Sequence, residues 1–154
     1  TLFGDGATAT LLTEDPVFDF GKFVFGSDGS KKEGIIVKED GLVHMNGRAV
    51  FAFTVRVIPN SIRKMLEKNL ITLKNIDRFL LHQGSLHIVN TIADTLGVSR
   101  EKCPFYSADY GNTVSSSVPM ILAQEFHNQE VKVAVLAGFG VGLSWASTLI
   151  FRKE

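Results

Sequence analysis

The sequence has few of the features that mark secreted, membrane-spanning or nucleic-acid-binding proteins. One cysteine in 154 residues excludes an internal disulfide and fits a reducing compartment. Sixteen basic and sixteen acidic residues cancel, so no charge excess points to nucleic acid or to an anionic membrane surface. The longest apolar-rich stretch, residues 131–151, is broken by glycine, serine and lysine and is unsuited to a membrane span. We therefore expect a cytoplasmic protein without a nucleic-acid or membrane partner.

The chain also lacks a methionine at its start and opens directly on Thr1-Leu2-Phe3. A strand-like segment so close to the first residue leads us to expect a further segment upstream. What is present is an ordinary share of apolar residues, 45%, which suffices for one globular domain with its own core.

Segments rich in β-formers occupy the first third of the sequence. Residues 7–13 and 18–25 are expected to be strands. Residues 34–45 are expected to form a short hairpin with Asp40-Gly41 at its turn.

The longest helical pattern follows, from Asn46 or Gly47 to Asn69. Apolar residues recur there at spacings of three and four, so one face of the helix is apolar. Pro59 lies inside the pattern, where it should kink the helix or mark a join between two helices.

The second half alternates short strands with helices. Strands are expected at residues 78–81, 105–107, 131–137 and 143–151, and helices at residues 86–96 and 115–127. Gly97 suits the end of the first of these helices, and Pro119 is tolerated in the first turn of the second. This order predicts an α/β fold, with a layered mixed β-sheet and packed helices.

Two polar residues lie next to predicted element ends, where sites in α/β folds are usually built. His82 follows the strand 78–81, and a histidine there can donate a hydrogen bond or carry a proton near neutral pH. Asn112 precedes the helix 115–127, and its amide can stabilise an oxygen that gains negative charge. From position alone, strand-end and turn capping explain both residues better than catalysis does.

Three further features of the sequence indicate structural roles and no catalytic or ligand-binding role. Gly138, Gly140 and Gly142 have the wrong spacing for a dinucleotide site and precede a strand, so they indicate a tight connection between two buried strands. Cys103 precedes Pro104, which disfavours the helical setting that activates a thiol, so we expect a buried or half-buried, non-nucleophilic cysteine. The histidines show no ligand spacing, and we expect no metal site.

Five short motifs lie in order along nearly the whole chain. They are Leu2–Ala7 (LFGDGA), Met45–Phe51 (MNGRAVF), His82-Gln83 (HQ), Tyr110–Pro119 (YGNTVSSSVP) and Gly138–Trp145 (GFGVGLSW). Together they resemble the second half of the β-ketoacyl-acyl carrier protein synthase III family of the thiolase fold. The resemblance implies one half of a thiolase-like fold. Residues 1–45 would be the end of the N-terminal half with its connecting strands and hairpin, and residues 46–154 the C-terminal ketosynthase III domain.

The resemblance implies a decarboxylative Claisen condensation of an acyl-coenzyme A with malonyl-acyl carrier protein, and no cofactor beyond these thioester substrates. In this scheme His82, as a neutral imidazole, and Asn112 are catalytic, because they hold the malonyl thioester carbonyl and stabilise the enolate oxygen. The family's nucleophilic cysteine belongs to the first half, and nothing here matches it. We therefore expect an acyltransferase of fatty acid biosynthesis and lipid metabolism whose C-terminal part is inactive alone.

The resemblance also implies binding roles. Gly47, Arg48 and Phe51 would lie near the mouth of the tunnel for the pantetheine arm of coenzyme A. The carrier protein would bind at Gln83, Gly84, Ser85, Leu86 and His87. Ser85 replaces a family asparagine and His87 an arginine, so the docking stretch carries less positive charge than is common.

The partners implied for a complete enzyme are acyl carrier protein, a coenzyme A thioester, the N-terminal half and a second copy in a homodimer. Two alternatives keep the family: a non-catalytic partner subunit of a split ketosynthase, and a ketosynthase III-like acyltransferase to oxygen or nitrogen, or a hydrolase. The missing methionine favours a part of a longer enzyme over a separate subunit. A cysteine encoded in frame upstream, at the start of a helix, would decide between them.

Overall fold

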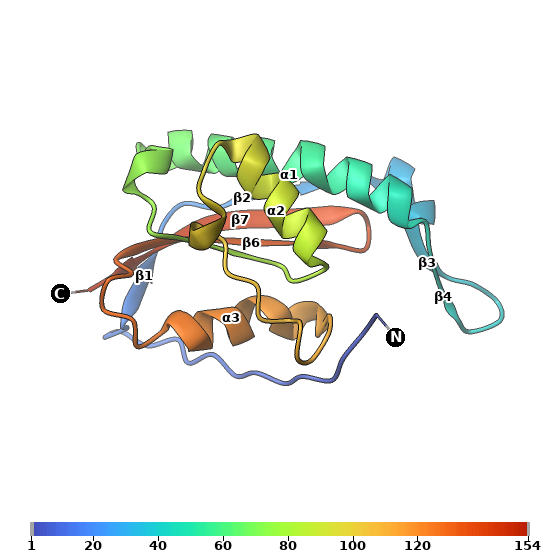
Figure 1. Cartoon of the computed structure of the whole chain (residues 1–154), viewed down its shortest axis with the longest axis horizontal. Helices are drawn as coiled ribbons and strands as arrows, with labels where there is room; N and C mark the ends of the chain where they lie inside the picture. The colour runs from blue at the N-terminus through green and yellow to red at the C-terminus, as the bar shows by residue number, and fades with distance from the viewer. Residues whose placement is uncertain (1, 154) are drawn as a thin grey trace.

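A mixed five-stranded sheet forms the centre of the molecule (Figure 1). The computed structural model describes residues 2–153. The sheet consists of β1 (Phe18–Phe20), β2 (Val24–Ser27), β5 (Arg78–Leu81), β6 (Val133–Gly140) and β7 (Ser144–Arg152). β5 pairs with β6 in parallel, β6 with β7 antiparallel, and both β1 and β2 pair antiparallel with β7. The expected mixed sheet is confirmed.

Helices cover both faces of this sheet, which gives the layered arrangement (Figure 1). α1 (Gly47–Asn69) and α2 (Leu86–Leu96) pack on one face, and α3 (Ser117–Glu125) packs on the other. The hairpin of β3 (Ile35–Val37) and β4 (Val43–Met45) projects beside the start of α1. Residues 2–153 also contain four 3-10 turns: η1 (Gly29–Gly34), η2 (Leu73–Asn75), η3 (Arg100–Lys102) and η4 (Val114–Ser116). Among the described residues, no helix has the length and apolarity to cross a membrane.

Local signals in the sequence set the ends of the two long helices. The Asn46 side chain accepts from the Ala49 N–H at 3.0 Å where α1 begins. Ser85 does the same for α2, and Gly97, at φ 75°, ends it. α1 continues through Pro59, so the expected join between two helices is wrong. Pro59 is buried, and packing on either side of it keeps the helix intact.

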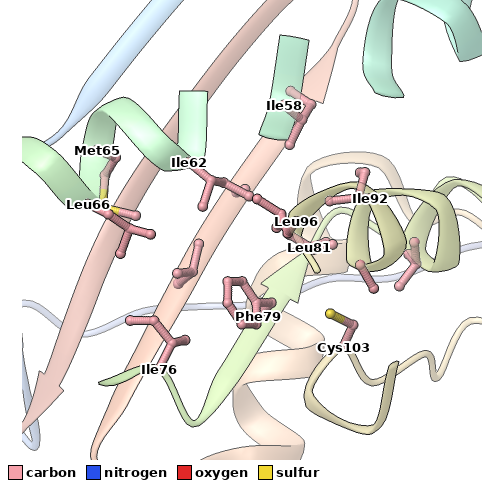
Figure 2. Packing of buried hydrophobic residues seen from close by; sticks show 14 of the residues in the cluster. Ile58, Ile62, Met65, Leu66, Ile76, Phe79, Leu81, Ile92, Leu96 and Cys103 are labelled. Atoms are coloured by element: carbon pink, nitrogen blue, oxygen red, sulfur yellow. The ribbon is translucent and has the colours of Figure 1, made fainter. Parts of the chain in front are cut away.

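The main hydrophobic core lies between the sheet and the layer of α1 and α2 (Figure 2). Ile62 and Met65 of α1 belong to the same cluster as Phe79 of β5, and all three are fully buried. A smaller cluster fills the α3 side and includes Leu80 of β5. Successive strand residues point to opposite faces, so β5 contributes to both clusters. Each such burial stabilises the fold by about 1.5–3 kcal/mol.

Two expected strands are absent because their backbones find no strand neighbour. Residues 7–13 run exposed along the outer side of α3 (Figure 1) without strand pairing. Residues 105–107 are not a strand either, since the Tyr106 N–H donates to the Gln83 side chain at 3.0 Å.

The expected strand at residues 18–25 is divided into β1 and β2. The Gly21 N–H still donates to the Leu149 carbonyl of β7 at 2.9 Å. The next N–H, of Lys22, instead donates to the Asn69 side chain at 2.7 Å, at the end of α1. The break therefore follows from a competing side-chain acceptor.

Candidate active site

A cavity of about 380 Å³ lies beside the starts of α1 and α2 and is lined by both His82 and Asn112. The N-terminal segment, the β3–β4 hairpin, α1, the loop between β5 and α2, and the β6–β7 connection all contribute to its wall. Most of the lining side chains are apolar, so the few polar groups in it act in a poorly solvated space. The two residues expected to converge therefore share one cavity.

His82 is positioned by the end of β5 and by the first residue of α3. Its backbone N–H donates to the Ala137 carbonyl at 2.8 Å, which continues the pairing of β5 with β6. Its Nδ1 is 2.6 Å from the Ser117 Oγ, and its ring packs edge-on against Phe139 at 5.1 Å between centroids. Nε2 is thereby the ring nitrogen left for a ligand.

The surroundings of His82 favour the neutral ring. Burial lowers the pKa of His82 below its usual value, and a backbone hydrogen bond at Val114 acts more weakly in the opposite direction. Gly84 borders this side of the ring, because a Cβ at that position would lie 3.7 Å from Nε2, at ordinary van der Waals contact. A neutral imidazole with its proton on Nε2 can donate a hydrogen bond into the cavity.

Asn112 is held by the N-terminal segment. Its backbone N–H donates to the Leu2 carbonyl at 3.1 Å, and its carbonyl accepts from the Gly4 N–H at 3.0 Å. Its Oδ1 accepts from the Val114 N–H at 2.9 Å. The side-chain oxygen is thus engaged locally, which leaves the amide NH₂ as the group that can donate to a ligand.

The five residues expected to bind a carrier protein have different environments. Gln83 is only 1% exposed, so it offers no surface to another protein, and we correct that expectation. Its Nε2 donates to the Leu81 carbonyl at 2.9 Å and the Pro104 carbonyl at 3.3 Å, which fixes the loop instead.

The other residues expected to bind a carrier protein lie at or near the cavity. Gly84, Ser85 and His87 line the cavity. Leu86 is 50% exposed at the surface.

Two of the three residues expected at the tunnel mouth line the cavity. These are Gly47 and Phe51 of α1. The Phe51 ring stacks flat on the His87 ring of α2, with centroids 4.9 Å apart. Arg48 is exposed and is not among the residues that form the cavity wall.

Cys103 is buried, as expected, and lies in the main core (Figure 2). Burial, with a smaller contribution from the charge of Asp94, raises the pKa of its thiol to about 12. A thiol in this setting is not a nucleophile near neutral pH.

Two contacts of His82 were not anticipated from the sequence. Ser117 is the last of three consecutive serines after Asn112, and only the fold shows which of them faces the ring. Phe139 lies between the glycines of β6, where strand pairing places it opposite Trp145. The glycine-rich segment therefore does more than connect strands, since it supplies a wall of the site.

A known protein family matches more than half of this chain. The family described as "3-Oxoacyl-[acyl-carrier-protein (ACP)] synthase III C terminal" matches residues 66–151. "Beta-ketoacyl-[acyl-carrier-protein] synthase III" of Staphylococcus aureus (strain Newman) is 36% identical over 97% of this chain and 49% of its own length. The protein of that name from Streptococcus mutans is 34% identical over 97% of this chain and 52% of its own length. The chain thus spans about half the length of these curated relatives.

Solved structures agree. The 3-oxoacyl-[acyl-carrier-protein] synthase III of Aquifex aeolicus superposes with a TM-score of 0.83 at 27% identity, over 91% of this chain and 46% of that one. The corresponding protein of Thermus thermophilus gives 0.79 at 30% identity, over 88% and 46%. The fold is thus that of one thiolase-like half, and this chain belongs to the 3-oxoacyl-[acyl-carrier-protein] synthase III family, as its C-terminal half.

Proposed function

We propose that this chain is the C-terminal part of an enzyme that condenses an acyl-coenzyme A with malonyl-acyl carrier protein, with loss of carbon dioxide. The observation that carries the proposal is the shared cavity of His82 and Asn112. Each residue has one side-chain atom engaged by the protein, His82 Nδ1 at Ser117 and Asn112 Oδ1 at Val114. With the Ser117 hydroxyl donating to Nδ1, His82 would keep its Nε2–H for a ligand, and Asn112 its amide N–H.

The proposed role of the pair is to stabilise an enolate. When the bond between the malonyl carbon and its carboxylate breaks, carbon dioxide leaves and the electron pair moves onto the thioester oxygen. The Nε2–H of His82 and the amide N–H of Asn112 donate to that oxygen as its charge grows. The carbanion then attacks an acyl thioester on a cysteine outside this chain, and the cysteine thiolate leaves.

The proposed partners follow from the arrangement around the cavity. Gly47 and Phe51 would border the pantetheine arm of coenzyme A, with Arg48 outside on the surface. A carrier protein would dock near Leu86 and His87, at the exposed start of α2. The N-terminal half of the enzyme, joined within residues 1–45, and a second copy would complete the assembly.

The test uses the complete enzyme that contains this chain, assayed separately for acyl-enzyme formation and for carbon dioxide release from a malonyl thioester. His82→Ala and Asn112→Ala should each lower carbon dioxide release about a hundredfold, because one preorganised donor is lost. Acylation of the cysteine should persist. The double variant should lose less than the product of both effects, since the two donors serve one oxygen.

The matched control is His127→Ala, which removes an exposed histidine near the end of α3. It should leave both half-reactions unchanged. Equal loss of acylation and decarboxylation in the His82 or Asn112 variant would contradict the division of roles. Efficient acyl transfer to water or an alcohol without carbon dioxide release would favour the acyltransferase alternative.

A further inference from the structure

One polar group on the cavity wall lacks a partner. Thr54 of α1 is 1% exposed and lines the same cavity as His82 and Asn112. Within residues 2–153, its Oγ1 makes no hydrogen bond. A buried hydroxyl without a partner destabilises the protein, so its presence calls for a ligand or another compensating group.

The other two threonines in the described α-helices make a hydrogen bond that Thr54 lacks. Thr91 donates to the His87 carbonyl at 2.8 Å, and Thr95 donates to the Thr91 carbonyl at 2.7 Å, each four residues back in α2. A helical threonine ordinarily satisfies its hydroxyl in this way. Thr54 makes no such bond, so its hydroxyl remains available at the cavity wall.

Thr54 also marks the buried end of one wall. Gly47, Phe51 and Thr54 recur along α1 at spacings of four and three, so they share one face of the helix. Gly47 is exposed, Phe51 is half-buried and Thr54 is buried. The cavity therefore deepens along about 10 Å of helix, by the ordinary rise per residue, and Thr54 is the polar group that α1 presents at depth.

We infer that Thr54 is a specificity-determining residue whose hydroxyl hydrogen-bonds to a secondary amide in the arm of the thioester substrate. The inference rests on the proposed function, because that function sets a thioester arm along this wall. The pantetheine arm carries an amide two carbons from its sulfur. An arm with only methylenes there would leave the hydroxyl unpaired, and a site built around a hydrogen bond discriminates against such analogues.

The test compares two malonyl thioesters in the complete enzyme. The N-acetylcysteamine thioester has the amide, and the n-pentyl thioester replaces it with methylenes. Thr54→Val, which keeps the shape and removes the hydroxyl, should raise the KM for the amide-bearing thioester about tenfold, with the KM for the pentyl thioester unchanged or lower. Thr54→Ser, which keeps the hydroxyl, should have the same ratio of the two KM values as the wild-type enzyme.

Thermal unfolding gives an independent readout. Thr54→Val should raise the Tm of the ligand-free enzyme by about 2 °C, because an unpaired buried hydroxyl is removed. The matched control is Ser61→Ala on the same helix, where the lost hydroxyl bonds to Ser147 Oγ at 2.8 Å. It should lower the Tm and leave the KM ratio unchanged.

The outcomes separate the two proposals. An equal change in KM for both thioesters in Thr54→Val, or no change for either, would overturn the inference about Thr54. Thr54→Ala provides a second variant with the same expected ratio should the valine disturb folding. A wild-type enzyme that releases carbon dioxide from neither thioester would instead overturn the proposed function, and the inference with it.

Discussion

His82 and Asn112 meet at one cavity but are held in place by different parts of the molecule. His82 continues β5 inside the sheet, and its ring contacts Ser117 and Phe139. Asn112 lies in a loop bound by backbone hydrogen bonds to Leu2 and Gly4, in the exposed N-terminal segment. One half of the pair is therefore fixed by the core, and the other by a segment at the periphery.

The difference shows where the site is least stable. Segments with few buried contacts open at lower free energy than core strands do. Phe3, at the bridge to Asn112, remains 46% exposed. Val114, next to the Asn112 contact, has a φ of 54°, which is costly for a β-branched residue. The asparagine side should consequently open at a lower free energy than the histidine side.

The largest effect should come from removing the buried support of the histidine side. Gln83→Ala deletes hydrogen bonds to the Leu81 and Pro104 carbonyls and from the Tyr106 N–H. We expect a loss of about 3 kcal/mol in the free energy of unfolding, because buried backbone groups lose their partners. Urea denaturation of the complete enzyme measures this.

Gln129→Ala, at an exposed position, serves as the control for Gln83→Ala and should change stability little. Equal losses in the two variants would contradict the supporting role of Gln83 on the histidine side.

A smaller effect should follow from breaking the support of the asparagine side. A Cβ at Gly4 would overlap the Tyr110 carbonyl oxygen, so Gly4→Ala must displace the N-terminal segment. We expect the free energy for opening of the Asn112 loop to fall by about 1.4 kcal/mol. The backbone N–H of Asn112 should then exchange its hydrogen with solvent about ten times faster. Gly29→Ala is the matched control, because a Cβ there meets no atom within 4 Å. Unaltered exchange in Gly4→Ala would show that the segment does not hold the loop.

The smallest effect concerns the proton on His82. Since burial lowers its pKa, the neutral donor should persist below the ordinary histidine value of about 6.5, and carbon dioxide release should decline only at lower pH. A Ser117 hydroxyl that donates to Nδ1 favours the neutral ring, so Ser117→Ala should move the acid limb of the pH profile to higher pH. Ser115→Ala, at an exposed position, should leave the profile unchanged.

The same shift makes stability depend on pH in a defined direction. Below about pH 6.5 the unfolded chain binds a proton at His82 that the folded protein resists, so the free energy of unfolding falls as the pH decreases through this range. A free energy of unfolding that increased on acidification from pH 6.5 would contradict a buried neutral His82.

Local patterns predicted the elements that depend on local signals. α2 was bounded correctly because Ser85 and Gly97 cap it, and β5 because a short apolar run precedes a polar turn. Residues 7–13 and 105–107 were misassigned because a strand requires a distant neighbour, which local composition does not encode. Gln83 was misjudged for a similar reason, since its burial depends on Tyr106, far along the chain.

The candidate site is indicated by the order of the motifs, and only in part by individual residues. Either His82 or Asn112 alone fits ordinary capping, and it is the fold that brings both to one cavity. Thr54 could not be singled out at all. In the sequence it is one polar residue within an amphipathic helix, and its missing hydrogen bond exists only in three dimensions.

The buried cysteine has a practical consequence for chemical labelling. With a thiol pKa of about 12, Cys103 stays almost wholly protonated near neutral pH, and the residue is only 3% exposed. Alkylating reagents such as iodoacetamide should therefore not react with Cys103 under native conditions. In the complete enzyme, labelling by such a reagent should therefore come from reactive cysteines other than Cys103, so Cys103 need not be replaced first.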